Sequence, residues 1–236
     1  MVNSKHGEHN LDFAMTRLIS AILARNEAAE DRYLRRVIAR CMEFSDDVLV
    51  LDDNSTDATR DIAAEMGCVV HVRADVVAWG AEAPARAQLW DAAAELAGPE
   101  GWVLVCDADM LLEGDPRPLC ASWGVTGWAF PLVDLWDSEE TFRVDGPWGH
   151  GPRTPRPWLF KPGALREPPV WPDRGVHVGH CPSNWLGPTG VAPDLFWRHL
   201  GWMKREHRQS KYTQYMSVRH QLTPFELAHA ESILDG

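Results

Sequence analysis

Short apolar runs that end in acidic residues are the most regular pattern along this chain. Residues 48–51 are apolar and lead directly into Asp52 and Asp53, and residues 102–106 lead into Asp107, Ala108 and Asp109. Such a run is typical of a buried strand that emerges at the carboxyl edge of a sheet, where open α/β folds bind ligands. Two of these strand ends side by side predict an acidic floor, although single acidic turns after strands are common.

Strands and helices alternate through the first half of the chain. Strands are predicted at residues 18–23, 47–51, 68–72 and 103–106, and helices at residues 30–44, 56–66 and 84–97. Ser55 or Thr56 is expected to cap the second helix, and Gly67 is expected to end it in the left-handed conformation. This order predicts an α/β fold with three α/β/α layers and a mostly parallel central sheet.

The second half has a different texture. A strand is predicted at residues 128–136 and helices at 205–218 and 224–234, while 11 of the 17 prolines lie between Pro147 and Pro193 and predict long loops. Ten of the 12 tryptophans lie at or beyond Trp102. Most are expected in the core, but tryptophan faces also suit sugar rings and favour a surface that binds an acceptor. We therefore predict one domain over residues 1–236, with a nucleotide-binding half at 17–115 and an acceptor half at 116–236.

Composition narrows the class of protein. The chain has 236 residues, of which 45% are hydrophobic, so it can bury a sizeable core. No apolar run approaches the roughly 18 residues of a membrane span, and residues 1–10 lack a signal-peptide core, which predicts a cytoplasmic protein. The five cysteines contain no CxxC pair and are interpreted as reduced core residues. The net charge of −11 argues against extensive non-specific binding of nucleic acid.

Three motifs together resemble a known family. Residues 52–57, Asp-Asp-Asn-Ser-Thr-Asp, resemble the DDxSTD signature of the GT-A glycosyltransferases, particularly glycosyltransferase family 2. Residues 24–27, Ala-Arg-Asn-Glu, resemble the first-strand loop of that family, and residues 107–109 resemble its DxD motif. The order and spacing of the three also agree with the family, over about residues 17–115. The resemblance implies a GT-A, Rossmann-like fold that binds a nucleotide-sugar donor.

The resemblance also implies roles for the acidic residues. Asp109 would hold a divalent cation, Mn²⁺ or Mg²⁺, and Asp107 would contact the ribose or the same metal. Asp53 would recognise the base, usually uracil. The physical chemistry agrees, because oxygen ligands suit these cations and a cation offsets the charge of a departing diphosphate. Asp52 is expected to cap or orient the loop rather than touch ligand, and Asp57 is expected as an acid in the first turn of the following helix, where the helix dipole favours it.

Other donor contacts are expected on the same grounds. The first loop supplies Ala24, Arg25, Asn26 and Glu27, and the DxD motif supplies Ala108. Arg86 resembles the arginine of an Arg-Asn pair near the donor, although Ala87 replaces the asparagine, and an arginine there suits a phosphate.

The late part of the chain adds a histidine and a basic segment. His199 resembles a late metal ligand of the family, and neutral imidazole suits Mn²⁺. The basic segment after it, with Arg208 and Lys211, is expected to close over the diphosphate and exclude water. His177 and His180 lie three residues apart, which on a strand places them on opposite faces, so acceptor contacts or a structural role are favoured over zinc.

The catalytic base is not marked by a motif. An inverting transferase needs a carboxylate that takes the acceptor proton, and inversion itself is implied only by the resemblance. The Glu-Asp signature of the family is absent here. Asp173 lies about where that signature would fall, and Asp134 ends a predicted strand next to the DxD strand, so these two are the candidates.

The sequence leaves the sugar, the acceptor and the oligomeric state open. The acceptor is a glycan, a small molecule, a protein or a modified DNA, and a transferase acting on hydroxymethylated DNA bases or phage proteins is one alternative. A sugar-nucleotide nucleotidyltransferase is another, but the loop at 24–27 lacks a Gly-rich phosphate motif. A catalytically inactive nucleotide- or glycan-binding module is the non-enzymatic alternative.

Overall fold

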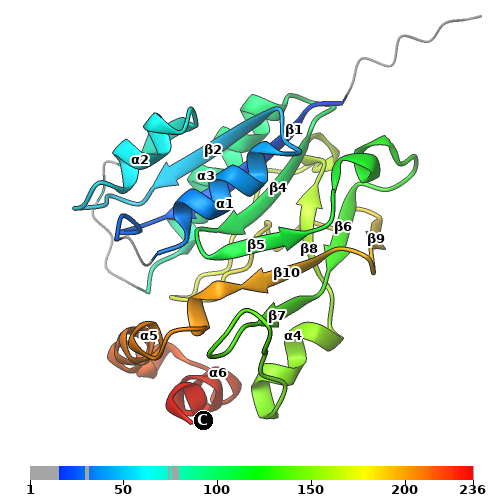
Figure 1. The fold of residues 1–236 in the computed structure, drawn as a ribbon. Helices are drawn as coiled ribbons and strands as arrows, with labels where there is room; N and C mark the ends of the chain where they lie inside the picture. The colour runs from blue at the N-terminus through cyan, green and yellow to red at the C-terminus, as the bar shows by residue number, and fades with distance from the viewer. Residues whose placement is uncertain (1–15, 30–31, 74, 76–79, 236) are drawn as a thin grey trace, which may run out of the picture.

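Two β-sheets carry the chain, and the larger one has the predicted parallel core (Figure 1). The computed structural model describes residues 16–29, 32–73, 75 and 80–235. The large sheet has the order β3-β2-β1-β4-β8-β6-β9 and the small sheet the order β5-β10-β7. Neighbours in β3-β2-β1-β4 are parallel, β8 is antiparallel to β4 and β6, and β9 is parallel to β6. The prediction of an α/β fold with a mostly parallel central sheet is confirmed.

The strands match the apolar runs closely in the first half of the chain. The large sheet consists of β1 (Leu18–Ala24), β2 (Asp47–Asp52), β3 (Val69–Val72), β4 (Trp102–Asp107), β6 (Gly127–Phe130), β8 (Arg156–Phe160) and β9 (Thr189–Val191). The small sheet consists of β5 (Met110–Glu113), β7 (Leu132–Asp134) and β10 (Phe196–His199).

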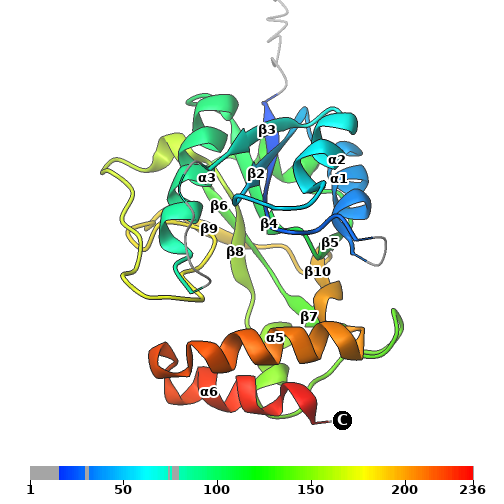
Figure 2. The same cartoon turned by 90° about the vertical axis from the view of Figure 1, so that its left-hand side faces the viewer.

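Helices cover both faces of the large sheet, which explains why its central strands are apolar on both sides (Figures 1 and 2). The helices α1 (Leu34–Met42) and α2 (Thr59–Glu65) lie on one face, and α3 (Ala83–Ala97) lies on the other. Side chains of β1 alternate accordingly. Leu18 and Ile22 pack in the cluster that contains α1, whereas Ile19 and Ala21 pack in the cluster that contains α3.

A third group of helices closes one end of the molecule. This group consists of the short α4 (His150–Arg153), α5 (Arg205–Ser217) and α6 (Pro224–Glu231). Figure 2 shows α5 and α6 side by side below the large sheet. Trp136, Trp148 and Trp202 fill the core beneath them. The indole N–H of Trp148 donates a 2.9 Å hydrogen bond to Ser232 Oγ, so these tryptophans are structural, as predicted for most of them.

The structure departs from the predicted elements in two places. The predicted strand 128–136 is divided at Pro131, whose missing N–H ends the ladder, into β6 and β7 of different sheets. The second helix begins at Thr59 with Ala58 at its N-cap, so the predicted cap at Ser55 or Thr56 is wrong, and the Thr59 backbone N–H donates to Asp57 Oδ1. Gly67 has the predicted left-handed φ of 84°. Glu30, the predicted start of the first helix, and residues 1–10 lie outside the described residues.

Among the helices in the described ranges, none combines the length and the apolar character needed to cross a bilayer.

Candidate functional site

The tight turn between β4 and β5 presents Asp107 and Asp109 at the carboxyl edge of the large sheet. β4 is parallel to β1, with Asp107 opposite Leu23, so the DxD turn lies next to the first loop. β5 then leaves to pair with β10, in antiparallel register with Met110 opposite His199. The backbone N–H of Leu200 donates to Asp109 O at 2.8 Å. The pairing therefore brings His199 to Asp109 across 90 residues of sequence.

His199 is held between two carboxylates. Its Nε2 lies 3.3 Å from Asp109 Oδ2, and its Nδ1 lies 2.7 Å from Asp134 Oδ1. Asp134 is opposite His199 in the parallel pairing of β7 with β10. A carboxylate on one ring nitrogen fixes the ring and turns the other nitrogen outward, as in many metal-binding histidines. This position makes Asp134 a partner of His199, whereas the sequence suggested it as a catalytic base.

Lys211 of α5 completes this group. Its Nζ lies 2.9 Å from Asp109 Oδ2 and 3.5 Å from His199 Nε2. Burial alone would raise the pKa of Asp109, but Lys211 and His199 hold that pKa well below its usual range. Burial disfavours a charged imidazole, yet Asp109 raises the pKa of His199 to about 9. Without a bound cation, the charge of Asp109 is therefore balanced by Lys211 and by a protonated His199, whose ring nitrogen must lose its proton before it can bind a metal.

Asp107 faces a second, separate pair of basic side chains, Arg86 and His180. Arg86 Nη1 of α3 lies 2.8 Å from Asp107 Oδ1, and His180 Nε2 lies 3.4 Å from Oδ2. Burial alone would raise the pKa of Asp107, but Arg86 and His180 outweigh burial and hold that pKa well below its usual range. The His180 ring also packs on Trp158, with centroids 4.2 Å apart. Arg86 was predicted as a phosphate contact. It is 5% exposed and forms an ion pair with Asp107 in this structure.

The first loop and the Asp-rich loop after β2 are tied together. Asn26 has a left-handed φ of 55°, its backbone N–H donates to Ser55 Oγ, and its Oδ1 accepts from the Thr56 N–H, both at 2.9 Å. The Ala28 N–H donates to Asp57 Oδ2 at 3.0 Å. Asn26 and Asp57 thus shape the two loops, and Asp57 precedes α2 instead of lying in its first turn as predicted.

Asp53 lies on the same edge but faces two arginines. Arg73 Nη1 donates to Asp53 Oδ1 at 2.7 Å, and Arg25 Nη1 lies 3.6 Å from Oδ2. The Asp53 N–H donates to Ala24 O at 2.8 Å, while Asp52 is buried and accepts from the Ser55 N–H. Arg73 is 4% exposed and was not among the predicted residues. Its position directly after the predicted strand 68–72 was the available signal.

Arg208 does not join the acidic edge, which we define as Asp53, Asp107 and Asp109 at the ends of β2 and β4, and the described residues show no contact of Asp173 with these carboxylates. Arg208 is buried, and its guanidinium donates to Trp202 O at 2.7 Å and to Asp137 Oδ1 at 2.7 Å, so it anchors α5. Asp173 is exposed in the loop between β8 and β9. Ala108 and Ala24 are buried, so only their backbone atoms are suited to a donor contact.

The fit of a divalent cation rests on Asp109 and His199. A carboxylate oxygen and an imidazole nitrogen that face each other at 3.3 Å are the ligand types that Mn²⁺ accepts. Within the part of the chain that the structure describes, no three His, Cys, Asp or Glu side chains already converge as a metal site. The two residues fit a divalent cation, and the remaining ligands of such a cation would have to come from a bound ligand or water.

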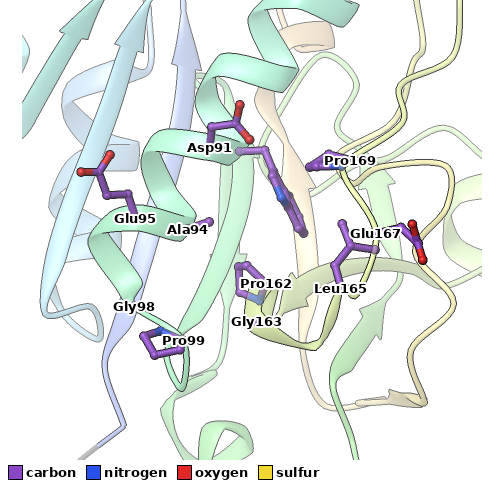
Figure 3. Close-up of a pocket in the computed structure, with 11 residues that line it drawn as sticks. Asp91, Ala94, Glu95, Gly98, Pro99, Pro162, Gly163, Leu165, Glu167 and Pro169 are labelled. Carbon is purple, nitrogen blue, oxygen red and sulfur yellow. The ribbon is translucent and has the colours of Figure 1, made fainter.

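A cavity of about 460 Å³ lies away from this edge (Figure 3). It is bounded by the second half of α3 and the segment around Pro162, with Trp90, Asp91 and Glu95 on one side and Glu167 on the other. The first turn of α3 carries Arg86 toward Asp107, so the far end of that helix belongs to the opposite edge of the sheet. The cavity is not part of the acidic edge.

Part of the first half of the chain matches a family model, and a longer relative matches most of the whole chain. Residues 21–117 match Glycosyl transferase family 2. The uncharacterized protein Rv3786c of Mycobacterium tuberculosis is 29% identical over 210 residues, which cover 82% of this chain and 49% of that protein. The chain therefore spans about half the length of this relative.

The chain is similar to two solved structures to different extents. S. aureus TarS (residues 1–349), in complex with UDP-GlcNAc, has a TM-score of 0.52 and 13% identity over 92% of this chain and 70% of that one. Glucosyl-3-phosphoglycerate synthase from Mycobacterium tuberculosis, in complex with Mn²⁺ and UDP-glucose, has 23% identity and a TM-score of 0.37 over 50% of this chain and 44% of that one. The likeness to TarS concerns the fold, not the substrate. The chain has the GT-A fold of the glycosyltransferases, and its residues 21–117 carry its similarity to glycosyl transferase family 2.

Proposed function

We propose that the protein is a metal-dependent glycosyltransferase that moves a sugar from a nucleoside-diphosphate donor, UDP in the first instance, to an acceptor hydroxyl with inversion. The observation that carries this proposal is the meeting of Asp109 with His199 Nε2 at 3.3 Å, with Asp134 behind the imidazole. The family match over residues 21–117 supports the same reaction class. Residues 17–115 would bind the donor and residues 116–236 the acceptor.

Asp109 and His199 would hold Mn²⁺ or Mg²⁺, which would offset the charge of the leaving diphosphate. Asp134 keeps His199 oriented, because its Oδ1 lies 2.7 Å from Nδ1 and constrains the ring. Asp107, paired with Arg86 and His180, faces the ribose side of the site in this proposal. In the DxD turn, Asp109 would therefore bind the metal and Asp107 would contact the ribose.

Asp53 and Arg73 would recognise the base. A carboxylate accepts the ring N–H of uracil, and the arginine beside it, 2.7 Å from Asp53 Oδ1, can donate to a neighbouring carbonyl. Arg25, 3.6 Å from Asp53 Oδ2, would lie on the same side with the rest of the first loop. The pair offers one acceptor and one donor, which is the complement of the uracil edge.

Asp173 is the proposed catalytic base, because Asp134 is committed to His199. Asp173 belongs to the same loop as His180, which reaches Asp107, and it is exposed to an incoming acceptor. A carboxylate there would take the hydroxyl proton as the acceptor oxygen attacks the anomeric carbon.

Glu27, a proposed donor contact, is a partly buried carboxyl whose surroundings disfavour its charged form. Its side chain is 17% exposed, and Arg32 Nε lies 3.9 Å from its Oε2. Burial, followed by the nearby charge of Asp109, raises the pKa of Glu27 to about 7. Since this folded pKa exceeds the unfolded value of 4.5, the folded state loses stability as pH rises from about 4.5 to 7.

Calorimetry with UDP separates the metal ligand from the base contact. Asp109→Asn is expected to lower UDP affinity about tenfold or more with Mn²⁺ and little without it, because it removes a ligand of the cation. Asp53→Asn is expected to lower UDP affinity in both conditions. Asp61→Asn, at an exposed position on α2, is the control. Full metal-dependent UDP affinity in the Asp109 variant would refute the assignment.

Steady-state kinetics with a donor and its acceptor test the base. Asp173→Asn is expected to lower kcat about 100-fold with donor affinity retained. Asp134→Asn is expected instead to weaken Mn²⁺ binding about tenfold and to be rescued by added metal, because it frees His199. Near-normal turnover of the Asp173 variant would remove that residue as the base.

Urea denaturation at two pH values tests Glu27. Glu27→Gln is expected to stabilise the fold at pH 8 by about 2 kcal/mol relative to its effect at pH 5, because the wild-type carboxyl must ionise in a buried place. Glu65→Gln, at an exposed position, should show no such difference. An equal effect of the Glu27 variant at both pH values would contradict the raised pKa.

A further inference from the structure

The ammonium group of Lys211 lies at the two atoms proposed to hold the divalent cation. Its Nζ is 2.9 Å from Asp109 Oδ2 and 3.5 Å from His199 Nε2, and it lies 4.4 Å from the centroid of the Trp202 ring. The lysine therefore already supplies Asp109 with positive charge from within the chain. A divalent cation bound by the same oxygen would meet a like charge within contact distance.

The surrounding backbone is shaped around this contact. A Cβ at Gly201 would lie 2.1 Å from Asp109 Oδ2 and 2.4 Å from Lys211 Nζ, so only glycine lets the chain pass so close. One turn earlier on α5, Arg208 fixes the helix through Trp202 O and Met203 O at 2.7 and 3.0 Å. The anchor holds α5 in place, while the four-carbon stem of Lys211 leaves its ammonium free to move.

The two carboxylates of the DxD turn differ in this respect. Arg86, the cation of Asp107, is 5% exposed on α3 and its guanidinium is rigid. The side chain of Lys211, the cation of Asp109, is 22% exposed. The cation of Asp109 is thus the exchangeable one.

We propose that Lys211 is an internal counter-ion that competes with the divalent cation for Asp109 and His199 and moves to the donor diphosphate when the two bind. The inference rests on the proposed function. Without a nucleotide, the displaced ammonium has no new anion, so metal binding alone is weak. With a nucleotide, the diphosphate accepts the ammonium, so metal and nucleotide strengthen each other's binding.

Mn²⁺ binding, measured by electron paramagnetic resonance of free Mn²⁺ with and without UDP, tests this exchange. Lys211→Met is expected to bind Mn²⁺ alone at least about tenfold more tightly than wild type, and the gain in Mn²⁺ affinity on adding UDP is expected to shrink by a similar factor. Lys211→Gln should behave alike, and thermal unfolding verifies that both variants fold. Lys161→Met, which removes an exposed lysine paired with Glu100, should match wild type.

Unchanged or weaker Mn²⁺ binding in both Lys211 variants, with the UDP effect intact, would overturn the inference while leaving the metal site standing. The Asp109→Asn variant separates the two claims. If wild type and Asp109→Asn bind Mn²⁺ equally with UDP present, the proposed metal site itself is wrong and the exchange falls with it.

Discussion

The pairing of β5 with β10 is the constraint on which the candidate site depends. It places Met110 opposite His199 and joins the Leu200 N–H to Asp109 O at 2.8 Å. Because β10 also pairs with β7, the same strand carries His199 to Asp134. The small sheet thus assembles a carboxylate, an imidazole and a second carboxylate from three distant parts of the chain.

Charge balance is the second organising feature. Four carboxylates, at positions 53, 107, 109 and 134, lie on this end of the molecule, and each faces a positively charged or protonatable partner. Ionised carboxylates cannot be buried without such partners, since desolvation is costly. The partners come from α3, α5, β10 and the segment that follows β3, so the acidic edge also ties different elements of the fold together. The net charge of −11 does not reveal this local balance.

The sequence predicted some parts of the site better than others. Strand ends are visible as apolar runs followed by acids, so Asp53, Asp107 and Asp109 were recognised directly. Arg208 and Lys211 are three residues apart on one helix, yet one anchors α5 and the other reaches Asp109. Both residues belong to the same basic segment of the sequence, and only the docking of α5 in the folded structure gives them different contacts. Arg73 was not predicted as a site residue, because a single arginine after a short strand does not form a recognisable motif.

By itself, the sequence determined the elements whose signals are local. Apolar periodicity set the strands and helices of the first half, and the glycine at position 67 set the end of α2, because both act over a few residues. Tertiary structure decided the pairing of β5 with β10, the division of the predicted strand at Pro131 between two sheets, and the meeting of Lys211 with Asp109 and His199. These features depend on the register of strands and the docking of a helix. The contact of Lys211 with Asp109 joins residues about 100 positions apart, and no local sequence pattern encodes such a contact.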